Sequence, residues 1–257
     1  VDLRYIPGPR YIGPPLSSPL PGCDLDLWDV PRRAVDVQLP GGRETYREVA
    51  AHPLADARTP RDIEAYPHWP DPDWFDYSAI ADQCQTARRK DRIVVFMGDR
   101  LNRVAQLKPA MYLRGIERIF LDLIESPDIA DTLFSRLRRF YRHYLDRVLA
   151  AARGGIDIVL TGDDFGAQTG PLLSPALWRR HLREGFQEYM HIIHRHGARA
   201  MHHTCGMVTP LVEDLKNAGL DILQSLQPEA MSADFPSLKR AHARSLAFHG
   251  GISVQQT

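Results

Sequence analysis

The chain has 257 residues, a length that a single large α/β domain reaches without dividing. Its 32 acidic and 32 basic residues cancel at pH 7, which argues against partners such as nucleic acid or an anionic membrane that bind through a strong electrostatic field. The sequence contains neither a signal peptide nor an apolar run of the roughly 18 residues that span a bilayer, and its three widely spaced cysteines do not suggest a disulfide framework, so we expect a cytoplasmic protein.

The first 92 residues are predicted to be a proline-rich leader with loops that pack on the body of the protein. Eight of the first 40 residues are proline, which excludes a helix because proline lacks a backbone N–H and clashes with the preceding turn. Two short extended segments, at 25–30 and 34–39, can pair as a hairpin.

Regular structure begins at 93–97, an apolar run typical of a strand buried on both faces of a parallel sheet. Helical periodicity follows over 108–124 and again over 128–153. The polar face of the second helix carries four arginines, for which we expect a solvated surface: Arg136, Arg139, Arg142 and Arg147.

The next strand is predicted at 156–160, and two adjacent carboxylates, Asp163 and Asp164, follow it. Sites in α/β proteins lie at the carboxyl ends of the strands, so these aspartates are candidate catalytic residues. Because aspartate also caps turns, we expect one of the pair to bind backbone N–H groups and the other to face a cavity.

A helix is predicted from Ser174, an N-cap followed by proline, to a stop at Gly197. The strand after it, at 198–206, carries His203 and Cys205, which alternation places on one face of the strand. Imidazole and thiolate ligands suit zinc. An isolated pair is equally consistent with a hydrogen-bonded histidine and a small buried cysteine in the core, and both interpretations stay open.

Further strands are predicted at 221–227 and 245–251. Strict alternation of strands and helices requires a parallel sheet with right-handed crossovers, either an open doubly wound sheet or a closed (β/α)8 barrel. No Gly-x-Gly-x-x-Gly motif follows the first strand, which favours the TIM-type barrel.

Five recognisable strands are too few for a barrel. Either further strands lie in the first 90 residues, or the chain lacks pieces of a longer parent at one or both ends. We therefore predict one α/β domain with a (β/α)8 TIM-type barrel, either completed by strands of the leader or incomplete at one or both chain ends, in which residues 1–92 form the leader and 93–257 the β/α units.

Parallel strands bring their carboxyl ends to one rim, so the polar residues at four strand exits are predicted to converge there. These residues are Asp99, Asp163, Asp164, His203, Cys205, Gln224 and Gln227.

Short motifs follow one another in a fixed order along residues 90–257: Gly162-Asp163-Asp164-Phe165-Gly166-Ala167-Gln168, Ser174-Pro175 with Trp178, His203-x-Cys205-Gly206, Gly219-Leu220-Asp221 and His249-Gly250-Gly251-Ile252. This succession resembles the uroporphyrinogen decarboxylase superfamily, and most closely its methylcobamide:thiol methyltransferase branch.

The resemblance implies a (β/α)8 barrel and assigns His203 and Cys205 to zinc. In that branch a further cysteine near the C-terminus completes the zinc site, and this chain ends before any counterpart. The third ligand is therefore either missing or supplied by an oxygen such as that of Asp164. We expect four other polar residues of this rim to contact the substrate: Asp99, Gln168, Gln224 and Gln227.

Three functions are compatible with these residues. The favoured one is zinc-dependent transfer of a methyl group from a methylated corrinoid, in some cases carried by a corrinoid protein, to a small thiol. The second is metal-free decarboxylation of a tetrapyrrole, a lyase reaction, although the arginine-rich motif of the true decarboxylases is not found in residues 1–92. The third is a non-catalytic barrel that binds a corrinoid or a porphyrin.

Overall fold

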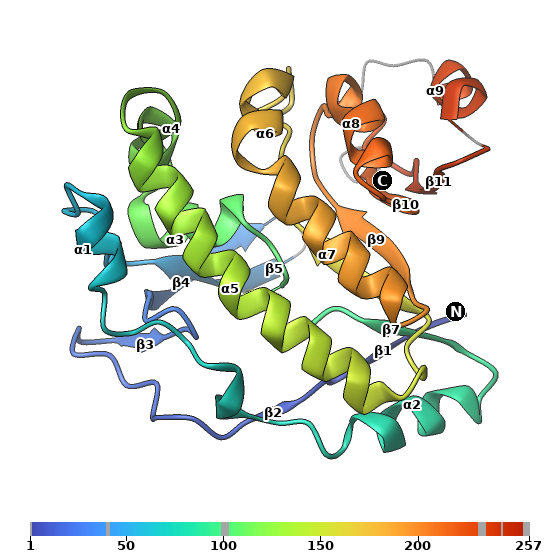
Figure 1. Ribbon diagram of the computed structural model, residues 1–257, viewed down its shortest axis with the longest axis horizontal. Coiled ribbons are helices and arrows are strands. Elements are labelled where there is room, and N and C mark those ends of the chain that lie inside the picture. The colour runs from blue at the N-terminus through green and yellow to red at the C-terminus, as the bar shows by residue number, and fades with distance from the viewer. Residues whose placement is uncertain (1, 40–41, 99–102, 231–234, 243, 254–257) are drawn as a thin grey trace.

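The computed structural model describes residues 2–39, 42–98, 103–230, 235–242 and 244–253. A six-stranded, fully parallel sheet in the order β1-β7-β8-β9-β10-β11 runs through the molecule and curls into part of a barrel (Figure 1). Its strands are β1 (Leu3–Ile6), β7 (Ile93–Phe96), β8 (Ile158–Gly162), β9 (Arg199–His203), β10 (Ile222–Leu226) and β11 (Ala247–Gly250).

The five predicted strands are confirmed, and β1 in the proline-rich leader adds a sixth. Its four residues end immediately before Pro7 and pair with β7, from Leu3 beside Ile93 to Ile6 beside Phe96. The α/β fold with an incomplete TIM-type barrel is therefore the observed architecture.

Both faces of the sheet are apolar, which explains why its strands lack polar alternation. Val94 and Phe96 belong to the main core under the helices, whereas Val95 packs on the opposite, inner face with Leu160 and Met201. Positions 201 and 203 of β9 therefore share the inner face.

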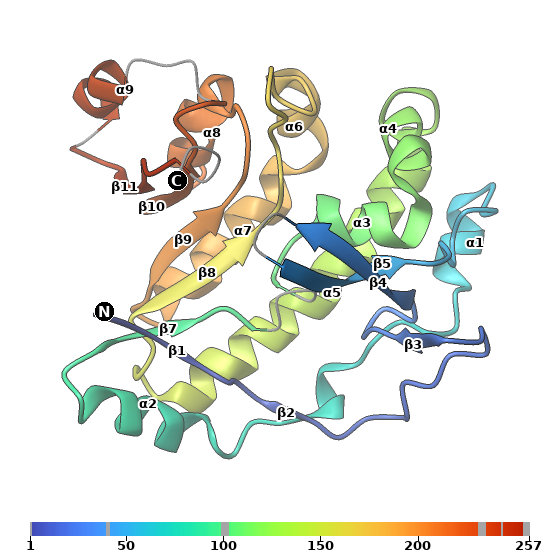
Figure 2. The ribbon, with the colours of Figure 1, turned by 180° about the vertical axis from the view of Figure 1, so that it is seen from behind.

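Helices cover the outer face of the sheet, as Figure 1 shows, and the strands come to the front when the molecule is seen from behind (Figure 2). The helical elements between and after the strands are α2 (Ile80–Arg88), α3 (Leu107–Arg114), α4 (Ile116–Glu125), α5 (Pro127–Ala152), α6 (Pro175–His181), α7 (Arg183–Arg195), η2 (Thr209–Leu211), α8 (Val212–Asn217) and α9 (Phe235–His242). In the described ranges, none of them has both the length and the apolar character needed to cross a bilayer.

Two predicted helices are each divided in the structure. The helix expected over 108–124 breaks at Gly115, whose φ of +88° is outside the helical region, into α3 and α4. The helix expected from Ser174 breaks at Leu182 into α6 and α7, although Ser174 caps it as predicted by accepting a hydrogen bond from the N–H of Leu177.

The leader forms two small antiparallel sheets beside short helices. Its elements are β2 (Arg10–Tyr11), β3 (Cys23–Leu25), β4 (Pro31–Leu39), β5 (Gly42–Val49), α1 (Pro60–Glu64), η1 (Pro72–Trp74) and β6 (Phe75–Asp76). The strand expected at 34–39 is present, but these residues pair with β5; of the 25–30 segment only Leu25, at the end of β3, pairs with β4, opposite Pro31. That segment turns because the Asp26 carboxylate accepts hydrogen bonds from the N–H groups of Trp28 and Val30.

Aromatic packing holds the leader on α5. The Trp28 ring is fully buried, with its centroid 5.2 Å from that of Phe140 and 5.3 Å from that of Tyr141. Large aromatic side chains bury much apolar surface, so this contact contributes strongly to the stability of the whole domain. The boundary between leader and barrel units at residue 92 stays a prediction.

Candidate metal centre

His203 is the last residue of β9, and Cys205 follows two positions later. The Nε2 atom of His203 lies 3.3 Å from the Sγ atom of Cys205, and both side chains are half-buried. The predicted projection of the two side chains to one side is therefore what the structure shows, because alternation along the extended chain returns every second residue to the same face.

The other face of this strand end is part of the packed interior. His202 is buried with its ring stacked on Phe165, 5.2 Å between centroids, and its Nδ1 lies 2.8 Å from the hydroxyl of Thr161. Burial lowers the pKa of His202 to about 3. Thr204, also buried, accepts a hydrogen bond from the N–H of Phe165.

Asp164, from the loop after β8, joins the pair. One ligand atom each of Asp164, His203 and Cys205 lies within 4.8 Å of the others. The Oδ1 atom of Asp164 accepts a hydrogen bond of 3.2 Å from the N–H of Cys205. The site therefore offers an oxygen, a nitrogen and a sulfur donor at one point.

Close backbone contact brings the two strand exits together. The N–H of Met207 donates a hydrogen bond of 2.8 Å to the carbonyl of Ala167. Gly206, with φ of +78°, lies so close to Gly166 that an added Cβ would be 2.5 Å from the Gly166 carbonyl carbon. Since such a distance is not tolerated, glycine is required here for Asp164 to lie beside Cys205.

Four neighbouring strands contribute one aligned row of residues. Gly162 of β8 is in register with His203 of β9, His203 with Gln224 of β10, and Gln224 with His249 of β11. Residues in register on parallel strands point to the same face of the sheet. The Nδ1 atom of His203 is 3.1 Å from Gln224 Oε1, and Gln224 Nε2 is 3.1 Å from His249 Nδ1.

Two cations adjoin this row, and our sequence interpretation missed both. Lys108 donates a hydrogen bond of 2.5 Å to the Oδ2 atom of Asp164. Arg103 occupies the space left by Gly162, where an added Cβ would lie 2.7 Å from the Arg103 Cδ atom. Both residues follow β7 in the sequence, so their position after a predicted strand could have marked them as candidates. Among the residues after this strand, the sequence analysis selected only Asp99.

The charges of the site favour ionised Asp164 and neutral His203. Burial on its own would raise the pKa of Asp164, but the hydrogen bond and charge of Lys108 and the N–H of Cys205 hold it below its usual range. Burial, assisted by the charge of Arg103, lowers the pKa of His203. A neutral imidazole has the free lone pair that binds a metal ion.

The surroundings of Cys205 favour its neutral, protonated form, whereas those of Asp164 favour the ionised form. Burial, followed by the negative charge of Asp164, raises its pKa. In the absence of a bound cation, Cys205 is therefore a thiol at neutral pH, and it needs a positive charge nearby to become a thiolate ligand.

Asp163 has the capping role that we expected for one member of the pair. Its carboxylate accepts hydrogen bonds from the N–H groups of Gln106, Leu107 and Lys108 at 2.6 to 3.0 Å, at the start of α3. Burial raises its pKa to about 6, although those N–H groups oppose the shift. Asp163 thus fixes the backbone of Lys108, and Asp164 alone faces the candidate metal centre.

The other predicted substrate residues are spread around this rim. Gln227 accepts a hydrogen bond of 2.7 Å from the N–H of Gly206, and Gln168 is exposed on the loop after β8. Asp99 lies outside the described residues. Contact of these side chains, and of Gln224, with a substrate stays a prediction.

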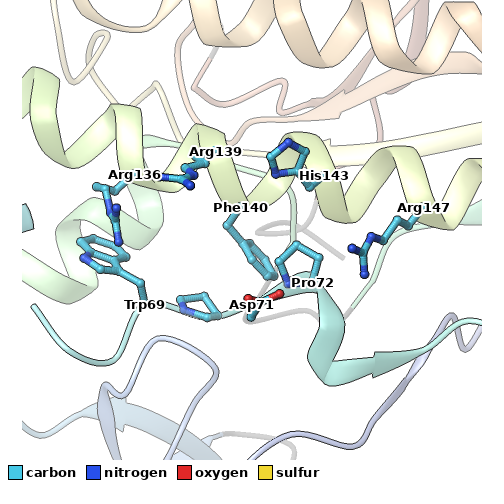
Figure 3. Close-up of a pocket in the computed structure, with 9 residues that line it drawn as sticks. Trp69, Asp71, Pro72, Arg136, Arg139, Phe140, His143 and Arg147 are labelled. Atoms are coloured by element: carbon cyan, nitrogen blue, oxygen red, sulfur yellow. The ribbon is translucent and has the colours of Figure 1, made fainter.

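The arginine face of α5 borders a separate groove of about 330 Å³ against the 69–72 segment (Figure 3). Arg136 lies over the ring of Trp69, 5.1 Å from its centroid, and pairs with Glu64. Arg147 pairs with Asp73. Two of the arginines expected to be solvated therefore also attach the leader to α5.

Comparison with known proteins agrees with this fold. The family model for uroporphyrinogen decarboxylase (URO-D) matches residues 54–236, which include β7 to β10 and all three candidate ligands. The chain belongs to the uroporphyrinogen decarboxylase family.

Among solved structures, this family member is similar to a methyltransferase from Methanosarcina mazei, with a TM-score of 0.57 at 16% sequence identity. The match covers 84% of this chain and 59% of that one, so the chain spans little more than half the length of its structural neighbour. At this identity the similarity supports the shared fold. No curated protein matches the sequence.

Proposed function

We propose that this member of the uroporphyrinogen decarboxylase family is a zinc-dependent methyltransferase that moves a methyl group from a methylated corrinoid to a thiol. The observation that carries the proposal is the convergence of Asp164, His203 and Cys205 within 4.8 Å at the strand exits of the barrel. The methyltransferase identity of the Methanosarcina mazei structure favours the same class of reaction.

The three side chains fit zinc by their donor chemistry. Catalytic zinc sites use three protein ligands from histidine, cysteine and carboxylate and keep a fourth position for the reactant. Among the described residues, Asp164 offers the third donor beside His203 and Cys205. Bound there, zinc would supply the positive charge that turns an incoming thiol into a thiolate at neutral pH.

The remaining residues of the site set its charge and bind the reactants. The ammonium group of Lys108 pairs with Asp164 at 2.5 Å and keeps this carboxylate ionised, although its charge also opposes a cation bound there, and Asp163 fixes the backbone from which Lys108 extends. Arg103 and Lys108 give the rim a positive charge next to the ligand row. The open side of this rim is where we expect a corrinoid, free or carried by a partner protein, to approach.

The alternative is metal-free decarboxylation of a tetrapyrrole, the reaction for which the family is named. In that reaction Asp164 would accept the pyrrole N–H groups and Arg103 would bind substrate carboxylates. Asp163 is unsuited to contact a substrate because backbone N–H groups surround its buried carboxylate.

Elemental analysis of the full chain, purified without chelators, tests the proposal. We expect about one zinc per chain in the wild type and a loss of most of it in Cys205→Ser. Cys23→Ser is the matched control, because Cys23 is likewise half-buried but lies in β3 of the leader. It should keep the wild-type zinc content.

Transfer of the methyl group from methylcobalamin to a small thiol provides the activity assay. We expect activity that a chelator removes and added zinc restores. A wild-type protein without zinc, or a decarboxylase activity that persists in the presence of chelator, would exclude the proposed reaction.

A further inference from the structure

The hydrogen bonds behind His203 determine which of its ring nitrogens can bind a metal ion. A neutral imidazole carries one proton, on Nδ1 or on Nε2, and only the unprotonated nitrogen has a lone pair for a ligand. Nε2 is the nitrogen that faces Cys205, at 3.3 Å from its Sγ atom. A metal ion shared with Cys205 therefore requires the proton to be on Nδ1.

Gln224 supplies the partner for that proton. Its Oε1 atom lies 3.1 Å from the Nδ1 atom of His203, and an amide oxygen can only accept a hydrogen bond. If the amide were turned around, its NH2 group would face Nδ1, and the proton of His203 would have to move to Nε2. The direction of the Gln224 amide thus decides whether His203 can be a ligand.

The other end of the Gln224 amide contacts His249. The Nε2 atom of Gln224 lies 3.1 Å from the Nδ1 atom of His249, and in the His249 tautomer with an unprotonated Nδ1 this contact favours the amide direction in which Oε1 faces His203. The register of β9, β10 and β11 places the three side chains in one row, so each reaches only its neighbour.

We propose that Gln224, held by His249, is a positioning residue that keeps His203 in the tautomer with a free Nε2. This inference rests on the proposed metal site and adds a function for Gln224 other than contact with the substrate. Outer residues that orient a metal-bound histidine typically change metal affinity by 10- to 100-fold when they are replaced.

Metal affinity is measured by competition between the stripped protein and a chelating zinc indicator. We expect Gln224→Leu to bind zinc about 10- to 100-fold more weakly than the wild type, because leucine cannot accept the Nδ1 proton. Gln224→Glu keeps an acceptor oxygen and should bind within about threefold of the wild type. Gln38→Leu, which changes an exposed glutamine of β4, should bind like the wild type.

Nitrogen-15 NMR of the histidine rings provides a second readout that requires no metal. The His203 signals, assigned by their loss in His203→Gln, should show the Nδ1–H tautomer in the metal-free wild type and in Gln224→Glu. In Gln224→Leu they should show a mixture of both tautomers.

The two readouts separate the proposals. A wild-type protein that binds no zinc but shows the Nδ1–H tautomer contradicts the proposed function and supports the positioning of His203 by Gln224. Unchanged zinc affinity together with an unchanged tautomer in Gln224→Leu overturns the positioning, whatever the metal content of the wild type.

Discussion

The carboxylate of Asp164 is hydrogen-bonded to the backbone N–H of Cys205, with 3.2 Å between Oδ1 and the nitrogen. This bond joins the exit of β8 to the exit of β9, two segments 41 residues apart in the sequence. An acid and a thiol that belong to different β/α units are in this way fixed at one point.

Replacement of Lys108 by methionine should strengthen zinc binding. The ammonium group of Lys108 contacts Asp164 at 2.5 Å and repels any cation bound by the same carboxylate. We expect affinity to rise about fivefold, which corresponds to removal of about 1 kcal/mol of repulsion. Competition with a zinc indicator measures the change. Lys216→Met, which removes a surface lysine paired with Glu213, is the control, and weaker binding by Lys108→Met would contradict the prediction.

Gly206→Ala should separate the two strand exits. The new methyl group would meet the carbonyl carbon of Gly166 at 2.5 Å, so the loops must move apart and Asp164 must leave Cys205. We expect a loss of zinc affinity of about tenfold or more. Gly197→Ala is the control, since Gly197 has a similar φ of +80° but no heavy atom within 4 Å of its added Cβ. If both variants lose affinity equally, backbone strain and not loop separation is responsible.

Truncation of Asp122 should destabilise the domain strongly. Its carboxylate forms a buried ion pair of 2.7 Å with Arg114, which also donates hydrogen bonds to the carbonyls of Leu54 and Ala55. Asp122→Ala leaves the arginine buried without its partner, at an expected cost of about 3 to 5 kcal/mol in the free energy of unfolding.

Urea denaturation measures this cost. Asp146→Ala, which removes the surface carboxylate shared by Arg195 and His196, should lower the free energy of unfolding by about 1 kcal/mol or less. Similar losses in the two variants would indicate that burial does not strengthen the Arg114–Asp122 pair.

Acid should destabilise the protein partly through His202. Burial lowers the pKa of this histidine from 6.5 to about 3, so between these values the unfolded chain binds a proton that the folded chain does not. Its contribution to stability is present above pH 6.5 and is lost as the pH falls towards 3. Each pH unit within that window costs about 1.4 kcal/mol.

His202→Phe keeps an aromatic ring between Phe165 and Phe186 but does not titrate. We expect the wild type to lose about 3 kcal/mol more than this variant between pH 7.5 and pH 4.5. Urea denaturation at both pH values provides the comparison. Parallel losses in the two proteins would show that His202 is not the titrating group.

The strands were predictable from the sequence because a strand buried on both faces of a sheet is a continuous run of apolar residues. Ile93 to Phe96 and Ile158 to Leu160 are continuous apolar runs, and each forms a strand where it was expected. β1 was missed because its four residues end at the first proline of the leader and are too few to show a pattern. The breaks between α3 and α4 at Gly115 and between α6 and α7 at Leu182 depend on how these helices pack. The periodicity of apolar residues in the sequence contains no information about that packing.

The candidate ligand set was predictable in part for a similar reason. Alternation along one strand is a local property, so His203 and Cys205 could be paired, and Asp164 was a candidate as the residue after a strand. Lys108 and Arg103 could not be assigned, because their positions depend on the cap at Asp163 and on the space above Gly162. Such contacts join residues more than 50 positions apart.

The candidate ligands Asp164, His203 and Cys205 lie together only when β8 and β9 are paired. An unfolded chain cannot present these three groups together, so an ion bound by them would favour the folded state by mass action. At a free zinc concentration 100 times the dissociation constant, this linkage contributes about 2.7 kcal/mol. The melting temperature should therefore rise with the zinc supply, and cells short of zinc would contain a less persistent form of the same protein.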